Sequence, residues 1–155
     1  MKNKLLLLAA LALAALWQVP ARADEHGRSV ALLPMYVQEC GACHAPFPPG
    51  LLPADSWQRL MKDLPRHFGT DASVDVATQK ALGVWLSTYA GSGKRARTAP
   101  PEDRITRSDW FVREHREVPA AAWKRASIKS AANCGACHEG AAQGRYDEDG
   151  VRIPR

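Results

Sequence analysis

The chain has 155 residues, of which 46% are hydrophobic and 24% are charged, a balance typical of folded proteins and not of disordered or fibrous ones. This length allows one domain or two small ones. Lysine and arginine number 21 against 16 acidic residues, so the formal net charge is +5. Part of this excess lies in the first residues of the chain, and nothing in the composition indicates nucleic-acid binding.

Residues 1–23 have the pattern of a secretory signal peptide. Lys2 and Lys4 precede an uninterrupted apolar run over residues 5–17, and the segment ends in Ala21-Arg22-Ala23. The run is shorter than the roughly 20 apolar residues that span a bilayer, so we expect cleavage after Ala23 and no membrane span afterwards. We therefore expect a periplasmic product. Cleavage would remove three positive charges and no acid, which lowers the formal charge from +5 to +2.

The five-residue sequence Cys-Gly-Ala-Cys-His occurs twice, as residues 40–44 and as residues 134–138. In a C-x-x-C-H sequence the two thiols add to the vinyl groups of a haem, and the adjacent histidine binds the iron. We therefore expect two covalently attached haem c groups. Their attachment residues and proximal ligands would be Cys40, Cys43 and His44 for haem 1, and Cys134, Cys137 and His138 for haem 2.

Two C-x-x-C pairs could also form a four-cysteine zinc site, a disulfide pair or thioredoxin-like redox motifs. None of these needs a histidine directly after the second cysteine. With five histidines in 155 residues, finding one at both positions by chance has a probability of roughly one in a thousand. The haem interpretation is therefore favoured. All four cysteines belong to the motifs, so none remains for a structural disulfide in an oxidising compartment.

Helical periodicity dominates the first half of the mature chain. Residues 29–39 predict a short helix, interrupted by Pro34, that runs into the first motif. Four prolines within residues 45–53 predict an extended loop beside the haem. Asp55 or Ser56 can cap a second helix, which Pro65 ends. One face of that helix carries Trp57, Leu60, Met61 and Leu64.

A third helix is predicted to extend to about Ala90 and to stop at Gly91. Its expected buried face consists of Ala81, Leu82, Trp85, Leu86 and Tyr89. The following glycines, basic residues and prolines have the composition of a linker. We therefore divide the mature chain into an N-terminal haem domain (24–92), a linker (93–103) and a C-terminal haem domain (104–155).

In the C-terminal part, Ser108 can cap a helix that carries Trp110, Phe111 and His115. Another helix is expected from about Ala120 to Asn133, and residues 140–155 show no periodicity. The alternation typical of strands is not found in the sequence, so we predict an all-α fold. The C-terminal part is small enough to need a haem as part of its core.

The residue on the far side of each iron decides the chemistry, because an open position would allow gases or peroxide to bind. The candidates are His26, His67, His115, Met35 and Met61. His67 lies 23 residues after His44, and His115 lies 23 residues before His138. Apart from His26 near the start, each predicted domain thus contains one spare histidine, which favours bis-histidine ligation at both irons. Methionine is the alternative ligand; the C-terminal domain has none.

The chain resembles the periplasmic dihaem cytochromes c. The resemblance spans most of the mature sequence and rests on residues 48–53, 56–57, 67–69, 104–107, 110–117, 134–138 and 151–154. It implies an N-terminal cytochrome-c-like helical domain, a smaller C-terminal haem domain and two low-potential bis-histidine haems. His44 and His67 would serve the first iron, His138 and His115 the second. The implied partners are an oxygen-binding soluble monohaem cytochrome c and a membrane cytochrome b that supplies electrons from quinol.

Two irons with protein ligands on both sides can only accept and pass on electrons, so the sequence favours an electron carrier over an enzyme. No nucleophile or acid–base pair is suggested elsewhere in the chain. The alternative is a dihaem enzyme or gas-binding protein in which one open iron binds peroxide, nitrite, nitric oxide or oxygen. We expect a monomer.

Overall fold

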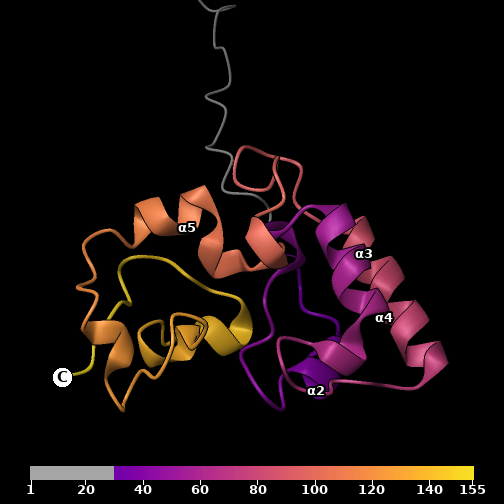
Figure 1. Ribbon diagram of the computed structural model, residues 1–155, viewed down its shortest axis with the longest axis horizontal. Helices are drawn as coiled ribbons and strands as arrows, with labels where there is room; N and C mark the ends of the chain where they lie inside the picture. The colour runs from indigo at the N-terminus through magenta and orange to yellow at the C-terminus, as the bar shows by residue number, and fades with distance from the viewer. Residues whose placement is uncertain (1–29) are drawn as a thin grey trace, which may run out of the picture.

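The computed structural model describes residues 30–155, so the predicted signal peptide and His26 lie outside the described residues. The α-helices are α2 (Pro34–Cys40), α3 (Ala54–Lys62), α4 (Val76–Thr88) and α5 (Asp109–Glu114), joined by turns of 3-10 helix and by irregular loops. Residues 30–155 contain no β-strand, only the isolated bridges His67–Thr70 and His138–Val151. The predicted all-α fold is confirmed. Figure 1 shows α2, α3 and α4 on one side of the molecule and the C-terminal segment on the other.

Helix α2 is shorter than predicted because it begins at Pro34, not at residue 29. Proline has no N–H to donate and its φ angle suits the first helical position, so it starts this helix instead of interrupting it. Tyr36 is the buried residue of the helix. The helix ends at Cys40, and Gly41 follows it as the C-cap, where a Cβ atom would lie 2.3 Å from the carbonyl oxygen of Val37. The chain therefore turns directly from α2 into the first C-x-x-C-H motif.

Helices α3 and α4 lie side by side and enclose the main hydrophobic core (Figure 1). The buried residues of that core are Tyr36, Leu52, Trp57, Met61, Leu64, Leu82 and Leu86. Two predicted members of the α4 face, Ala81 and Tyr89, are instead exposed. The core-facing stripe of α4 is narrow, with only Leu82 and Leu86 fully buried, so the residues that flank the stripe remain in solvent.

The helix starts differ in how they are capped. The predicted cap of α3 by Asp55 or Ser56 is wrong, because Pro53 precedes the helix and no side chain caps it. Asp55 lies in the first turn, where its charge is favourable next to the helix N-terminus. In α4 the Asp75 carboxylate accepts hydrogen bonds from the backbone N–H groups of Ala77 and Thr78, both at 3.0 Å.

The C-terminal half contains little regular helix. Ser108 caps α5 as predicted. The helix predicted over 120–133 is wrong, since only Ala122–Lys124 form a short 3-10 turn. Lys129 has a φ of +68°, which a right-handed helix cannot accommodate, and the Asn133 side chain donates to the carbonyl of Ile128 at 3.0 Å. Local side-chain bonds thus replace the helical ladder there.

Residues around the predicted linker contact both halves of the chain. The guanidinium of Arg95 lies 5.7 Å from the ring centroid of Trp110. Asp103 pairs with Arg59 of α3, and Ile105 packs against the N-terminal core. The boundary at 93–103 stays a prediction. None of the helices in the described part of the chain has the length and apolar character needed to cross a membrane.

Candidate haem centres

The first C-x-x-C-H motif begins at Cys40, the last residue of α2, and two aromatic side chains hold the proline-rich loop after the motif. The Tyr36 hydroxyl donates to the carbonyl of Phe47 at 2.9 Å, and the Trp57 indole donates to that of Pro49 at 2.7 Å. The Phe47 ring in turn stacks on His44, with centroids 4.8 Å apart. The Nδ1–H of His44 donates to the carbonyl of Ala45 at 2.7 Å, which leaves Nε2 free to bind a metal.

His67 lies on a turn beyond α3 and faces His44. Its carbonyl accepts a hydrogen bond from the N–H of Thr70 at 3.1 Å, which closes the turn. The centroids of the His44 and His67 rings are 6.2 Å apart, and the ring planes differ by 24°. Burial lowers the pKa of His67, and the charges of His44 and Arg104 lower it further. The ring is therefore held neutral, the form that binds a metal.

The second motif is shaped by backbone hydrogen bonds and by the C-terminal tail. Cys134–Ala136 form a 3-10 turn, and the N–H of His138 donates to the carbonyl of Cys134 at 2.8 Å. The N–H of Arg152 donates to the carbonyl of Cys137 at 2.9 Å, and Val151 forms a bridge with His138. The irregular tail thus covers the motif. Burial, followed by the charge of His115, lowers the pKa of His138.

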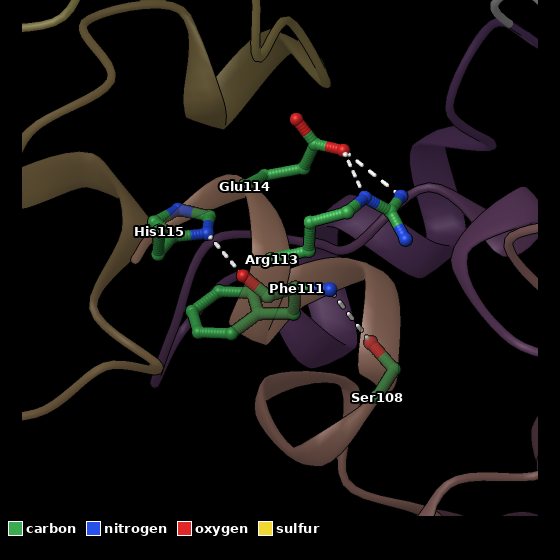
Figure 2. Close-up of polar contacts among 5 residues, drawn as sticks. All are labelled: Ser108, Phe111, Arg113, Glu114 and His115. Atoms are coloured by element: carbon green, nitrogen blue, oxygen red, sulfur yellow. Dashed lines mark hydrogen bonds and ion pairs between the residues drawn. The ribbon is translucent and has the colours of Figure 1, made fainter. Parts of the chain in front are cut away.

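His115 occupies the end of α5, directly beyond Glu114. Its Nδ1–H donates to the carbonyl of Phe111 at 2.9 Å, and its ring stacks on the Phe111 ring with the centroids 3.9 Å apart (Figure 2). Phe111 lies four residues earlier, a spacing that places both rings on one face of a helix. The centroids of His115 and His138 are 6.1 Å apart, with the ring planes 72° from each other.

Both histidine pairs have the spacing that a shared iron requires. A metal–imidazole bond is about 2 Å long and the ring centroid lies about 1 Å behind the nitrogen, so two axial rings have centroids roughly 6 Å apart. The observed separations of 6.2 and 6.1 Å agree with this. In His67 and His138 the Nδ1 atoms are buried without a hydrogen-bond partner among the described residues, so no hydrogen bond of Nδ1 fixes the rotation of these two rings. The residues present therefore fit two haem irons, one between each pair.

The alternative uses of the cysteines fit the structure poorly. Burial raises the pKa of the Cys40 and Cys134 thiols to about 11, whereas a thiol redox motif needs a lowered value. The four cysteines form no disulfide, and all of them lie in the described part of the chain. Within residues 30–155 no group of three or more His, Cys, Asp or Glu side chains could hold a metal ion. The four-cysteine zinc arrangement is therefore not formed.

The two methionine candidates differ in burial. Met61 belongs to the buried core, and Met35 lies on α2 with 40% of its surface exposed. The sequence did not lead to the contacts by which Phe47 and Phe111 support His44 and His115. The contact of Phe111 could have been predicted, because Phe111 and His115 lie four residues apart in a predicted helix. Nor did the sequence lead to the contact between Phe68 and Arg104, whose guanidinium lies 4.1 Å from the ring centroid.

Two C-x-x-C-H motifs, each with a second imidazole facing its histidine, define a c-type haem protein with two haems. Residues 36–146 match the family described as dihaem cytochrome c, and the chain belongs to that family. It therefore carries two covalently bound haem c groups, and it is an electron carrier and not an enzyme. No curated protein matches the chain.

Solved dihaem cytochromes c resemble the chain in sequence and in fold. The chain is 34% identical to a dihaem cytochrome c from Shewanella baltica OS155, with a TM-score of 0.68; the match covers 78% of this chain and 92% of that one. It is 40% identical to DHC purified from Rhodobacter sphaeroides, with a TM-score of 0.65; the match covers 76% of this chain and 99% of that one. A further structure of the dihaem cytochrome c from Rhodobacter sphaeroides is 38% identical, with a TM-score of 0.66.

Proposed function

We propose that this protein relays electrons in the periplasm through two low-spin haems, each with two histidine ligands. His44 and His67 bind the iron of haem 1, and His138 and His115 bind the iron of haem 2. The observation that carries this proposal is the spacing of the two ring pairs, 6.2 and 6.1 Å between centroids. Both values suit an iron held between two imidazoles.

This ligation makes each iron an outer-sphere redox centre. The haem supplies one-electron chemistry, and the protein supplies rigid axial ligands that close the iron to gases and peroxide. His44 and His115 each donate Nδ1–H to a backbone carbonyl, which fixes the tautomer with Nε2 free for the iron. Such a donor also raises the basicity of the imidazole, which favours the ferric state and a low reduction potential.

The proposed donor is a membrane cytochrome b that oxidises quinol, and the proposed acceptor is a soluble monohaem cytochrome c that binds oxygen. The resemblance of the sequence to periplasmic dihaem cytochromes c supports both partners. The signal-peptide pattern of residues 1–23 supports a periplasmic location. We further propose that the carrier is a monomer.

The ligand assignment is tested on the haem-loaded protein with three variants. His67→Ala and His115→Ala should each open one iron, so that high-spin bands appear in the ferric spectrum and one ferrous haem binds carbon monoxide. His26→Ala is the matched control and should keep two low-spin haems. A His67→Ala or His115→Ala protein that stays fully low-spin and does not bind carbon monoxide would remove that residue from the assignment.

The proposed direction of transfer is tested by rapid mixing. The reduced protein should transfer electrons to the ferric form of a soluble, oxygen-binding monohaem cytochrome c within milliseconds to seconds, at a rate that rises with the acceptor concentration. A rate no faster than that with an unrelated c-type cytochrome would contradict the proposed acceptor.

A further inference from the structure

We propose that Phe68 and Arg104 form a clamp that fixes the imidazole of His67 on the iron of haem 1, so that both are positioning residues for this ligand. The inference rests on the proposed ligation of haem 1 by His67. It adds a role for two residues that lie outside both motifs in the sequence, one of which begins the predicted C-terminal domain.

The backbone beside His67 is held in an unusual conformation. Phe68 has a φ of +51° and Gly69 a φ of +95°. Glycine adopts the left-handed region freely, but a bulky aromatic residue rarely does so. Such conformations persist where the surrounding structure holds them, and they concentrate at functional sites. Here the conformation brings the Phe68 ring within 4.8 Å of the His67 ring, measured between centroids.

Arg104 covers the Phe68 ring. Its guanidinium carbon lies 4.1 Å from the ring centroid, well inside the range of a cation–π contact. The Nε of Arg104 also donates to the Glu102 carboxylate at 3.2 Å. The His67 and Phe68 rings are tilted by 55°, and with Arg104 they form a continuous series of contacts from the ligand to the segment after the linker.

That segment is itself anchored to the N-terminal half. Glu102 and Asp103 both have positive φ angles, +56° and +55°. The Asp103 carboxylate accepts two hydrogen bonds from the Arg59 guanidinium, at 2.8 and 2.7 Å. Ile105, the next residue after Arg104, packs against the hydrophobic core. A bidentate ion pair on one side and a core contact on the other therefore fix the position of Arg104.

The other proposed sixth ligand is held differently, which explains why His67 needs such a clamp. The Nδ1–H of His115 donates to a backbone carbonyl, and this bond fixes the rotation of the ring. The Nδ1 of His67 has no partner among the described residues. An open pocket of about 190 Å³ also adjoins His67, lined mainly by charged side chains such as Arg59, Asp63 and Glu102. This pocket leaves space beside the His67 ring, so the contact with the Phe68 ring, tilted by 55°, is what restricts its movement.

The test uses the electron paramagnetic resonance of the oxidised, haem-loaded protein, because this signal depends on the angle between the two axial rings. Near-parallel rings, as at haem 1 (24°), split the iron orbitals strongly, whereas near-perpendicular rings, as at haem 2 (72°), leave them nearly degenerate and give a more anisotropic signal. The two haems can therefore be followed separately. Arg104→Gln and Phe68→Leu should shift or broaden the haem 1 signal and leave the haem 2 signal unchanged.

A kinetic readout accompanies the spectra. Loss of an exposed cation–π contact should speed carbon monoxide binding to ferrous haem 1 by about fivefold in Arg104→Gln. Arg104→Lys keeps a cation over the ring and should restore most of the wild-type behaviour. Arg107→Gln is the matched control, because Arg107 also pairs with Glu102 but does not cover Phe68, and it should leave haem 1 unchanged.

The outcomes separate the clamp from the ligation. If His67→Ala leaves haem 1 low-spin, the proposed ligation by His67 is wrong, and the proposed clamp is then wrong as well. If His67→Ala opens haem 1 but Arg104→Gln and Phe68→Leu both keep the wild-type signal and carbon monoxide rate, only the clamp is overturned. A shift that occurs equally in Arg107→Gln would also overturn it, since the effect would then come from the Glu102 ion pairs.

Discussion

Ser108→Ala tests whether the start of α5 controls His115, the proposed sixth ligand of haem 2. The Ser108 side chain makes two hydrogen bonds (Figure 2 shows the first): Oγ accepts from the N–H of Phe111 at 3.3 Å and donates to the carbonyl of Ile105 at 2.7 Å. The residue is 5% exposed, so water does not readily replace either bond. Both the helix and the turn before it depend on this hydroxyl.

The magnitude follows from these two bonds. Loss of a serine cap costs about 1 kcal/mol. The carbonyl of Ile105 keeps its bond from the Ser108 backbone N–H at 3.1 Å but loses the bond from the hydroxyl, which costs about 1 kcal/mol more. The helix has only 6 residues, so fraying at its start reaches His115 at its end. A total of about 2 kcal/mol corresponds to roughly a 30-fold increase in the population of locally opened α5.

The assay is the rate at which added imidazole binds ferric haem 2 in place of the proposed ligand His115. If replacement requires opening of α5, the rate in Ser108→Ala should rise by the same factor of roughly 30. Asp75→Ala is the matched control: it removes the cap of α4, carries a comparable stability cost, and should leave this rate unchanged. A Ser108→Ala protein that is destabilised but exchanges its ligand at the wild-type rate would refute the reasoning.

Two further predictions concern the supports of haem 1. Trp57→Phe removes the buried hydrogen bond to the carbonyl of Pro49 and should lower the free energy of unfolding by about 1–3 kcal/mol, measured by chemical denaturation; a loss below about 0.5 kcal/mol would contradict this. Asp103→Asn should destabilise the protein at pH 7 more than at pH 3, measured by thermal unfolding at both values. The hydrogen bonds from Arg59 lower the pKa of the Asp103 carboxyl in the folded protein. The ion pair therefore contributes fully to the free energy of unfolding above the pKa of the unfolded chain, about 4, and this contribution is lost as the pH falls through the lower pKa of the folded protein. An equal loss at both pH values would show that the charge of Asp103 is not involved.

The sequence predicted well those features that depend on nearby residues. The two C-x-x-C-H motifs, the Ser108 cap and the Leu82–Leu86 stripe each follow from a short pattern. Apart from His26 at the start of the mature chain, each predicted domain has one spare histidine, and this led to the two pairs whose ring centroids lie about 6 Å apart in the structure. For the same reason the proline-rich segment was correctly predicted as a loop, although residues Pro49–Leu51 form a 3-10 turn within it.

Features that depend on distant contacts could not be predicted. Residues 120–133 contain good helix formers, yet Lys129 adopts a positive φ and the buried residues there, Ala122 and Ile128, are not arranged as a helical face. The contact between Phe68 and Arg104 joins residues 36 positions apart. It depends on a backbone conformation that phenylalanine rarely adopts, and no short sequence pattern predicts that conformation. Tertiary packing overrides propensity in both places.

The two proposed sixth ligands are held by different means, and the difference follows from what each half of the chain can bury. The N-terminal half has two packed helices, so its ligand can lie on a strained turn that the core and the Arg59–Asp103 pair hold in place. The C-terminal half has one short helix, and its fully buried apolar residues are few and mostly small, chiefly Ala122, Ile128 and Ala141. There the ligand is fixed by its own hydrogen bond and by the Phe111 stack, and the haem itself has to complete the core. Ligation and folding are therefore more tightly linked at haem 2 than at haem 1.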